Sequence, residues 1–222
     1  MKNRYKILII SAILLIATLL NTGCIDRDAV TYEVVFDATW SEETHPDDFP
    51  SNPHFSGLIG ATHNDEVSFW TEGELASPGI KNMAETGSKN PLQQEILTAI
   101  GDRTAYNRIT GNGIATSPGS VSIEFKVSKD YPLVSLVTMI APSPDWFVGV
   151  DSLSLYENDE FVDEKVVTLY AYDAGTDSGT NYTSPDDPTD PPETIFKIEG
   201  NPFYYEEEIV PLGTFTFKLV KE

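Results

Sequence analysis

The chain has 222 residues, with 35 Asp and Glu against 14 Lys and Arg, and a formal charge of −21 at pH 7. This charge excludes generic attraction to nucleic-acid backbones or anionic lipid surfaces, because both need a basic patch. Hydrophobic residues at 40% and aromatic residues at 11% suffice for the core of one ordinary domain. The single Cys excludes a disulfide scaffold and zinc sites built on paired thiolates.

The first residues have the pattern of an export signal. Lys2, Arg4 and Lys6 precede an apolar run over residues 7–20, and small or polar residues then lead to Cys24. The segment resembles a bacterial lipoprotein signal, which implies cleavage after residue 23 and lipidation of Cys24. An uncleaved membrane anchor and an ordinary secretory signal are the alternatives. All three readings place the rest of the chain outside the cytoplasm, with any membrane contact made through the N-terminal segment.

Short β-type segments dominate the sequence from residue 31 onward. They are rich in β-branched and aromatic residues, several alternate apolar with polar positions, and turn residues separate them. The segments are residues 31–36, 121–127, 133–140, 147–156, 165–172, 194–199 and 214–220. Seven or eight such strands predict an all-β fold, an antiparallel β-sandwich with Greek-key connections.

One segment has the spacing of a helix, over residues 91–100. Pro91 suits a first helical turn, and one apolar stripe follows it, formed by Leu92, Ile96, Leu97 and Ile100. A shorter helical turn is expected over residues 79–85. Because the sequence contains no repeat and no second hydrophobic unit, residues 31–222 are expected to form one domain after a short linker, residues 24–30.

Three aspartates are predicted to meet at one end of a sheet. Asp145 follows two prolines, which force the chain out of one strand just before the next begins. Asp173 and Asp177 follow the strand over residues 165–172, and a glycine between them favours a tight loop. If strands 147–156 and 165–172 are antiparallel neighbours, the three carboxylates lie at the same end.

Three carboxylates brought together would repel one another. At an effective dielectric constant near 20, each pair about 5 Å apart costs roughly 3 kcal/mol. A divalent cation would relieve this repulsion, and carboxylate, carbonyl and water oxygens suit calcium better than transition metals. The same residues are equally consistent with ordinary Asp-Gly turns, so spacing alone leaves both interpretations open.

Several longer motifs carry a family resemblance. They are PSPDWFVGVDSL at residues 142–153, DAGTDSG at 173–179, YTSP at 182–185, WS at 40–41, HFS at 54–56 and LIGATH at 58–63. These motifs resemble those of the spondin N-terminal domain family, the F-spondin and mindin type of domain that also occurs in bacterial exported proteins. The resemblance extends from about residue 32 to the C-terminus.

The resemblance implies an eight-stranded antiparallel β-sandwich that carries a calcium ion in loops at one end. The metal ligands of the family match Asp145, Asp173 and Asp177. Some relatives add an acidic ligand from the strand before the first motif. Lys126 stands near that place here, so Glu124 is only a tentative fourth ligand. The animal domains also carry cysteines that this chain lacks.

Catalysis has little support in the sequence. His45, His54 and His63 follow at intervals that match neither a helix-borne metal pair nor a catalytic triad, and no GxSxG, HExxH or phosphate-binding glycine loop is present. His63 is expected to be buried and hydrogen-bonded. Asp145 with Asp173 could imitate the two carboxylates of a glycosidase. The three Trp residues are expected in the core, with an exposed sugar-binding platform as the alternative.

The predicted function is an exported, membrane-anchored, calcium-binding β-sandwich module for cell-surface adhesion or ligand recognition, lipid-anchored at Cys24 in the cell envelope. Its expected cofactor is a calcium ion, and its expected partners are calcium and an extracellular protein or glycan. No catalytic residue, organic cofactor or nucleic-acid partner is predicted. The alternatives are a carbohydrate- or glycolipid-binding module and a hydrolase that uses the acidic loops.

Overall fold

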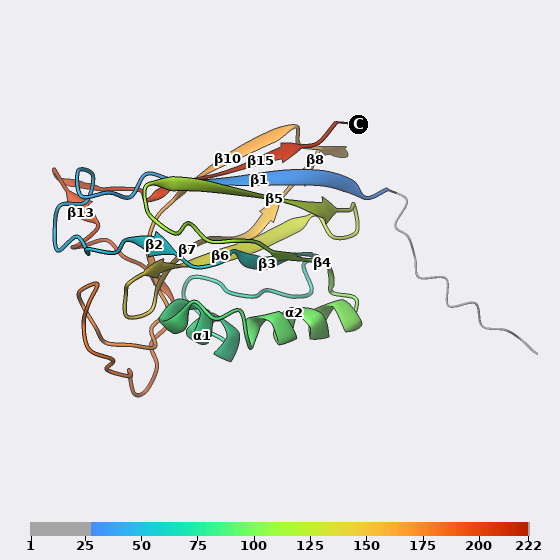
Figure 1. Cartoon of the computed structure of the whole chain (residues 1–222). Coiled ribbons are helices and arrows are strands. Elements are labelled where there is room, and N and C mark those ends of the chain that lie inside the picture. Colours follow the sequence, from blue (N-terminus) through green and yellow to red (C-terminus); the bar gives the residue numbers. More distant parts are fainter. Residues whose placement is uncertain (1–27, 222) are drawn as a thin grey trace, which may run out of the picture.

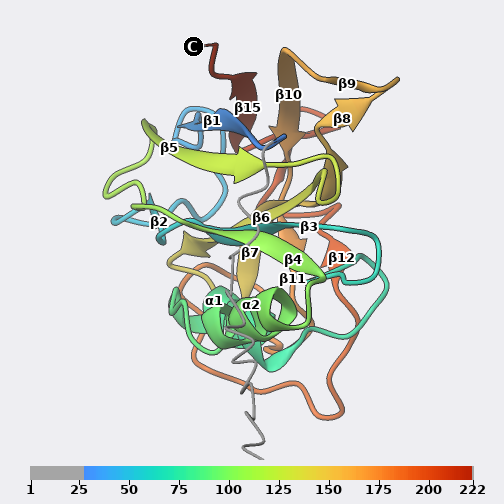
Figure 2. The same cartoon turned by 90° about the vertical axis from the view of Figure 1, so that its right-hand side faces the viewer.

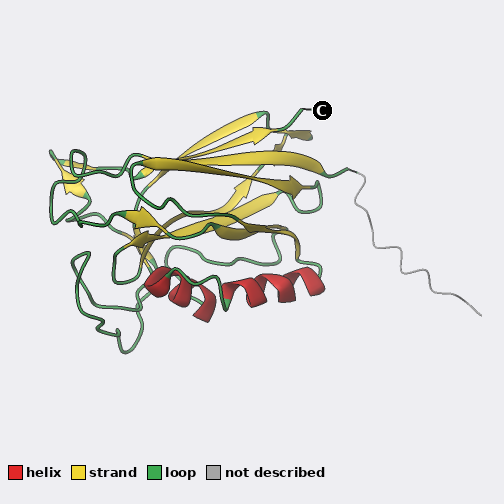
Figure 3. Cartoon of the chain, in the orientation of Figure 1, coloured by secondary structure: helices red, strands yellow, loops and turns green. Residues whose placement is uncertain are grey.

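The computed structural model describes residues 28–221, which form two facing β-sheets and a layer of two helices (Figures 1 and 3). The predicted signal peptide, the lipidation site at Cys24 and residues 25–27 of the predicted linker lie outside the described residues. Within residues 28–221, no helix is both long enough and apolar enough to cross a membrane.

The first sheet has four antiparallel strands in the order β10-β15-β1-β5. Its bounds are Glu164–Leu169 for β10, Gly213–Leu219 for β15, Val30–Ala38 for β1 and Gly119–Val127 for β5. Every second side chain of β1 is buried, namely Tyr32, Val34, Phe36 and Ala38. This period of two turns one face of the sheet toward the core, as the alternating sequence predicts.

The second sheet has the path β12-β11-β7-β6-β3-β4, and β2 also pairs with β6. Its strands are β2 (His54–Phe55), β3 (Ile59–His63), β4 (Ala105–Thr110), β6 (Leu133–Ala141), β7 (Trp146–Ser154), β11 (Tyr172–Asp173) and β12 (Phe196–Lys197). Figure 2 shows helices α1 (Pro78–Thr86) and α2 (Leu92–Gly101) beneath this sheet. Since one face meets the first sheet and the other meets the helices, β3 is buried at every residue.

The core therefore has two parts. The larger part lies between the sheets and is rich in aromatic residues, including Phe36, Phe55 and Phe215, whose rings pack edge to face. The smaller part lies between the second sheet and the helices, where Ile80 and Ile96 are fully buried. Both parts share the second sheet as a common layer.

The predicted all-β sandwich is confirmed. Eight strands have five residues or more in the described part of the chain: β1, β3, β4, β5, β6, β7, β10 and β15. Two small hairpins join them, β8 (Tyr156–Glu157) with β9 (Glu160–Phe161), and β13 (Tyr204–Tyr205) with β14 (Glu208–Ile209).

The predicted helix is confirmed as α2, with Pro91 immediately before it, and the expected helical turn near residue 79 is α1. One position of the predicted stripe is wrong. Leu92 and Ile96 are buried, but Leu97 is 41% exposed and Ala99 is buried instead. The helix rests on the sheet along the line of Leu92, Ile96 and Ala99, so Leu97 faces away from it.

The predicted pairing of strands 147–156 and 165–172 is wrong in part. Residues of β10 pair with β15 in the first sheet, where Leu169 lies opposite Gly213. The chain then crosses between the sheets, and only β11 pairs with β7, with Tyr172 opposite Phe147 and Asp173 opposite Trp146. The predicted single strand is thus two strands in different sheets, and the second one positions the acidic residues.

Candidate acidic loop site

The three predicted aspartates come together at one end of the second sheet, on the left in Figure 1. Asp145 ends the loop between β6 and β7, Asp173 belongs to β11, and Asp177 follows in the next loop. The β7–β11 register places Asp173 beside Trp146, and the Ala174 N–H donates to the Asp145 carbonyl at 3.2 Å. The antiparallel pairing therefore joins two segments that are far apart in the sequence.

Asp145 is the most enclosed of the three, with no exposed surface. Its Oδ2 atom accepts hydrogen bonds from the Thr176 N–H at 2.7 Å, the Thr176 hydroxyl at 3.1 Å and the Asp177 N–H at 3.0 Å. Its Oδ1 atom is buried without a hydrogen-bond partner. Burial raises the pKa of Asp145, against the opposing effect of those hydrogen bonds. A buried carboxylate oxygen without a partner is costly unless something positive contacts it.

Asp173 lies next to this buried group. Its Oδ1 accepts from the Gly175 N–H at 2.7 Å and its Oδ2 from the Trp146 indole N–H at 3.1 Å. The pKa of Asp173 is raised to about 7. Burial is the larger cause, and the negative charge of Asp145 is the second. In the protein without a metal, the charge of Asp145 thus opposes the ionisation of Asp173, and the charge of Asp177 opposes the ionisation of Asp145.

Asp177 is tied down entirely by backbone donors. Its Oδ1 accepts from the Gly179 N–H at 2.8 Å, and its Oδ2 accepts from the Asp187 N–H at 2.9 Å. The second bond comes from a loop ten residues further along the chain. Asp177 therefore joins two loops as well as contributing a carboxylate.

The loop after Asp177 folds back along the first one. The Ser178 N–H donates to the Asp187 carbonyl at 2.8 Å, Thr189 N–H to Thr176 at 3.1 Å, and Glu193 N–H to Gly175 at 2.8 Å. Gly175 has a φ of +72°, and a Cβ there would lie 2.3 Å from the Glu193 carbonyl oxygen. Only glycine fits that position without displacing the second loop.

Between the two loops lies a cavity of about 240 Å³ lined by Asp173, Asp177 and Glu193, among others. Sequence reasoning missed Glu193, whose charge also raises the pKa of Asp173. The Pro- and Asp-rich composition of residues 184–192 indicates a loop but not its pairing with residues 174–178. The register of that pairing, which brings Glu193 to the cavity, leaves no signal in a single sequence.

Glu124, the tentative fourth ligand, is not brought to the site. It lies on β5 of the first sheet with an exposed side chain, opposite Glu33 of β1. The acidic loops instead lie near the other end of β1, where Trp40 and Trp146 both pack against Tyr182. Glu124 therefore lies too far along β5 to serve as a ligand together with the three aspartates.

The acidic loops contain oxygen atoms of the kind that bind metals, but these oxygens do not surround a common point. Across residues 28–221, no three His, Cys, Asp or Glu side chains form a group that could hold a metal ion as they lie. The donor set is nevertheless all oxygen, and the unpartnered Asp145 Oδ1 beside Asp173 is the one feature that a hard cation would satisfy.

His63 and the three tryptophans have the structural places expected of them. His63 is fully buried, with Nδ1 donating to the Asn64 carbonyl at 2.8 Å and Nε2 at 2.9 Å from the Ser135 hydroxyl. Burial lowers its pKa. Trp40, Trp70 and Trp146 are all buried, which confirms the core assignment and removes the alternative of an exposed tryptophan platform.

Fold and site together define a two-sheet β-sandwich domain with an acidic double loop at one end. The Spondin_N family model matches residues 30–209, which is most of the chain. The chain therefore belongs to the spondin N-terminal domain family, as its motifs indicated.

Animal spondins are among its relatives. The chain is 33% identical over 213 residues to Spondin-2 of Rattus norvegicus, covering 90% of this chain and 64% of the relative. It is 35% identical over 194 residues to Spondin-2 of Homo sapiens, covering 82% and 58%, respectively. With Spondin-1 of Gallus gallus the identity is 36% over 198 residues, covering 83% and 24%. The chain spans less than two thirds of the length of each of these relatives.

Proposed function

We propose that the chain is an exported, membrane-anchored, calcium-binding module for cell-surface adhesion or ligand recognition. The observation that carries the calcium part is the buried Asp145 carboxylate, with one oxygen unpartnered and the Asp173 carboxylate beside it. Burial of two interacting carboxylates without a counter-charge opposes folding. A bound cation would remove this cost.

Asp145, Asp173 and Asp177 would hold the ion, and loop carbonyls and water would complete its coordination shell. Oxygen donors without His or Cys favour calcium over zinc or copper. The hydrogen-bonded oxygens of Asp173 and Asp177 each keep a second lone pair for a metal. Calcium would supply positive charge that ties the β6–β7 loop to the double loop after β11, ordering the end of the sandwich that presents loops to a partner.

Calcium binding is tested with the purified chain in EDTA and in calcium. We expect saturable heat of binding in isothermal titration calorimetry and a rise in melting temperature, since a ligand at 100 times its Kd stabilises by about 2.7 kcal/mol. Asp145→Asn and Asp173→Asn should each abolish the calcium-dependent rise. Asp130→Asn, which removes the same charge from an exposed turn, should retain it. Identical melting curves with and without calcium in the wild type would refute the calcium site.

Export and anchoring rest on the N-terminal sequence and on membership in the spondin family. Expression in a bacterium with metabolic labelling by an alkyne-tagged fatty acid should label the wild type in the membrane fraction. Cys24→Ala should lose the label. Label that persists in Cys24→Ala would show that the lipid is attached elsewhere, and unlabelled wild-type protein in the membrane fraction would indicate an uncleaved segment instead.

Adhesion or ligand recognition is supported by the same family membership, and it is tested by binding to immobilised extracellular matrix proteins and to a glycan array, each with calcium and with EDTA. Calcium-dependent binding to matrix proteins would support adhesion. Glycan binding alone would favour the carbohydrate-binding alternative. A hydrolase that uses Asp145 is disfavoured because this carboxylate has no surface exposed to a substrate, and a panel of chromogenic glycosides and esters tests that alternative directly.

A further inference from the structure

A second cavity, which none of the three aspartates lines, lies on the side of the sandwich. Its volume is about 350 Å³, within the range of ~300–1,000 Å³ that is usual for ligand pockets. Its lining includes Gly149 and Val150 of β7, Val167 of β10 and residues of the segments that follow β10 and precede α1. The cavity therefore opens where an edge strand of the first sheet faces β7 of the second.

This side of the sandwich is open for a topological reason. On the opposite side, polar bonds join β5 to the second sheet. The Lys126 N–H of β5 donates to Asn107 Oδ1 of β4 at 2.8 Å, and the Thr62 hydroxyl of β3 donates to the Lys126 carbonyl at 3.1 Å. At the cavity, β11 pairs with β7 only at Trp146 and Phe147. Within the described residues, no strand pairs with the rest of the outer edge of β7, and side chains form the walls instead.

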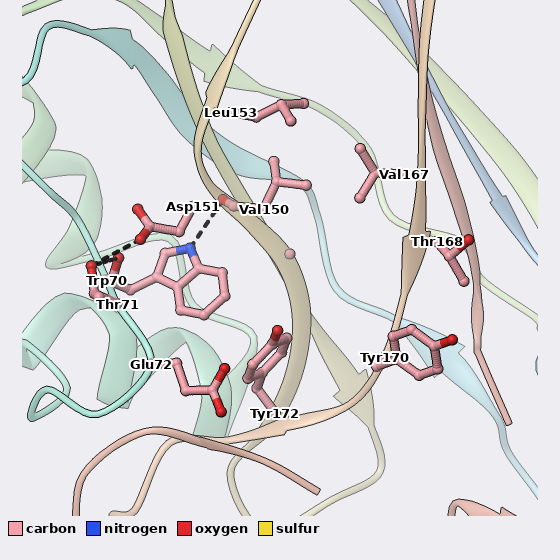
Figure 4. A pocket seen from close by; sticks show the side chains of 11 residues that line it. Trp70, Thr71, Glu72, Val150, Asp151, Leu153, Val167, Thr168, Tyr170 and Tyr172 are labelled. Carbon is pink, nitrogen blue, oxygen red and sulfur yellow. Dashed lines mark hydrogen bonds between the residues drawn. The ribbon is translucent and has the colours of Figure 1, made fainter. Parts of the chain in front are cut away.

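Aromatic rings and carboxylates make up the distinctive part of the lining. Figure 4 shows Trp70, Glu72 and Asp151 on one side, Tyr170 on the other and Tyr172 between them. Trp70 is held in place, because its indole N–H donates to the Val150 carbonyl at 3.1 Å and its ring packs edge to face on Tyr172. The walls are thus fixed before any ligand arrives.

The two carboxylates form no ion pair in the described part of the chain, and the titratable base that interacts with Asp151 is the buried His63, whose pKa is lowered by burial. Asp151 is oriented by hydroxyl groups, with Oδ2 accepting from Thr71 at 2.9 Å and Oδ1 from Ser152 at 2.7 Å. These bonds position the carboxylate without neutralising its charge. In the stretch from residue 28 to residue 221, neither Asp151 nor Glu72 forms an ion pair, and no Lys, Arg or His lines the cavity.

One wall already contacts a cation. The Lys197 ammonium lies 3.8 Å from the centre of the Tyr170 ring, within the distance of a cation–π interaction. Lys197 is not part of the lining. The Tyr170 ring therefore already interacts favourably with an ammonium group. The carboxylates of Glu72 and Asp151 lie on the facing wall (Figure 4).

We propose that this cavity binds a basic side chain, lysine or arginine, of a protein partner. The half-buried Tyr170 and Tyr172 rings would hold the aliphatic stem and the charged head, and Glu72 with Asp151 would supply the negative charge. A sugar is a poorer match, because the indole of Trp70 is buried against Phe147 and Tyr172 and offers no open face for stacking. The inference does not depend on calcium, since none of the three aspartates lines this cavity.

The test uses blocked amino acids as probes and follows the amide and indole signals of the full chain by NMR. Nα-acetyl-lysine methylamide and Nα-acetyl-arginine methylamide should shift the Trp70 indole signal saturably, and Nα-acetyl-norleucine methylamide, a neutral analogue of lysine, should bind at least tenfold more weakly. Affinity should fall as salt is raised. Repeating the titration in EDTA separates this site from the calcium proposal, whose failure would leave these results unchanged.

Charge-matched variants make the test specific. Glu72→Gln should weaken binding of the lysine probe at least threefold, whereas Glu74→Gln, two residues away and outside the lining, should change it less than twofold. Lys197→Gln should tighten binding, because it removes a competing positive charge from Tyr170. Equal binding of the norleucine probe, an unchanged affinity in Glu72→Gln, or a stronger response to methyl glycosides than to the lysine probe would each overturn the proposal.

Discussion

Trp146 and Asp173 lie opposite each other in the β7–β11 pair, and the indole N–H of Trp146 donates to the Asp173 carboxylate at 3.1 Å. The Trp146 ring also packs edge to face on Tyr182 and Phe203, at 5.3 Å from each ring centre. One residue thus connects the sandwich core to the acidic loop site. The geometry of Asp173 depends on the packing of a core aromatic side chain.

Replacing Trp146 with Phe should therefore affect stability and calcium binding together. The substitution removes a hydrogen bond to a charged group, worth about 1.5–3 kcal/mol, and leaves a gap in the aromatic cluster. Because that hydrogen bond lowers the pKa of Asp173, its loss favours the protonated form and should weaken calcium binding. Urea unfolding and calorimetry measure the two effects.

Trp70→Phe is the matched control for this experiment. Trp70 is also buried and also loses one donated hydrogen bond, in this case to the Val150 carbonyl. The substitution should lower stability by less, because only a hydrogen bond to a neutral carbonyl is lost, and it should not change the affinity for calcium. If both variants weakened calcium binding equally, the effect would be a general consequence of instability, and the link from Trp146 to Asp173 would have no functional meaning.

Gly175 provides a test of the double loop. Gly175→Ala should destabilise the protein by more than the ~1 kcal/mol of an ordinary left-handed strain, because the new Cβ would lie 2.3 Å from the Glu193 carbonyl oxygen. Gly73→Ala isolates the conformational part alone, since Gly73 has a φ of +91° and a Cβ added there would meet no neighbouring group within 4 Å. Equal unfolding free energies for the two variants, measured in urea, would mean that the second loop moves aside at little cost.

The sequence predicted those parts of the fold that leave a local pattern. Alternating apolar residues marked β1, β5 and β15, whereas β3 is buried on both sides and shows no alternation. The crossing between β10 and β11 went unpredicted because one continuous β-type run contains both strands. Tertiary contacts determine which strand pairs with which, and a run of β-type residues does not identify the partner strand.

The acidic site divides in the same way. Proline and glycine placed Asp145, Asp173 and Asp177 at strand ends and turns. The assumed antiparallel neighbours and then the family motifs indicated that the three residues lie together. Glu193 reaches the cavity only through the pairing of its backbone with Gly175, and that register is a long-range property. The prediction that Glu124 is a ligand was wrong. The alternating pattern of β5 indicates which face of the strand Glu124 occupies, but it does not indicate which sheet the strand joins.

The raised pKa of Asp173 predicts a pH dependence of stability. In the unfolded chain this carboxyl titrates near 3.8, whereas in the folded protein without metal its pKa is about 7. Between these values the folded state holds a proton that the unfolded state has lost, so stability falls as pH rises through this window. In EDTA, the melting temperature of the wild type should fall more between pH 5 and pH 8 than that of Asp173→Asn.

Calcium should reverse this trend, because the metal binds the deprotonated carboxylates. The rise in melting temperature on adding calcium should be larger at pH 8 than at pH 5. The comparison with Asp173→Asn is needed because burial lowers the pKa of His45 and His63, and these groups stabilise the folded state as pH rises toward 6.5. A calcium effect of the same size at both pH values would contradict the assignment of Asp173 as a ligand.

Two adjacent residues of α2 differ in burial, and this difference predicts how the helix layer contributes to stability. Ile96 is fully buried against the second sheet, whereas Leu97 is 41% exposed. Ile96→Ala should cost about 2–5 kcal/mol, since it opens a cavity between helix and sheet, and Leu97→Gln should change stability by no more than about 0.5 kcal/mol. Urea unfolding at constant pH measures both. A large loss in Leu97→Gln would mean that the outer face of α2 is covered in solution, because an exposed side chain of a helix has no packing to lose.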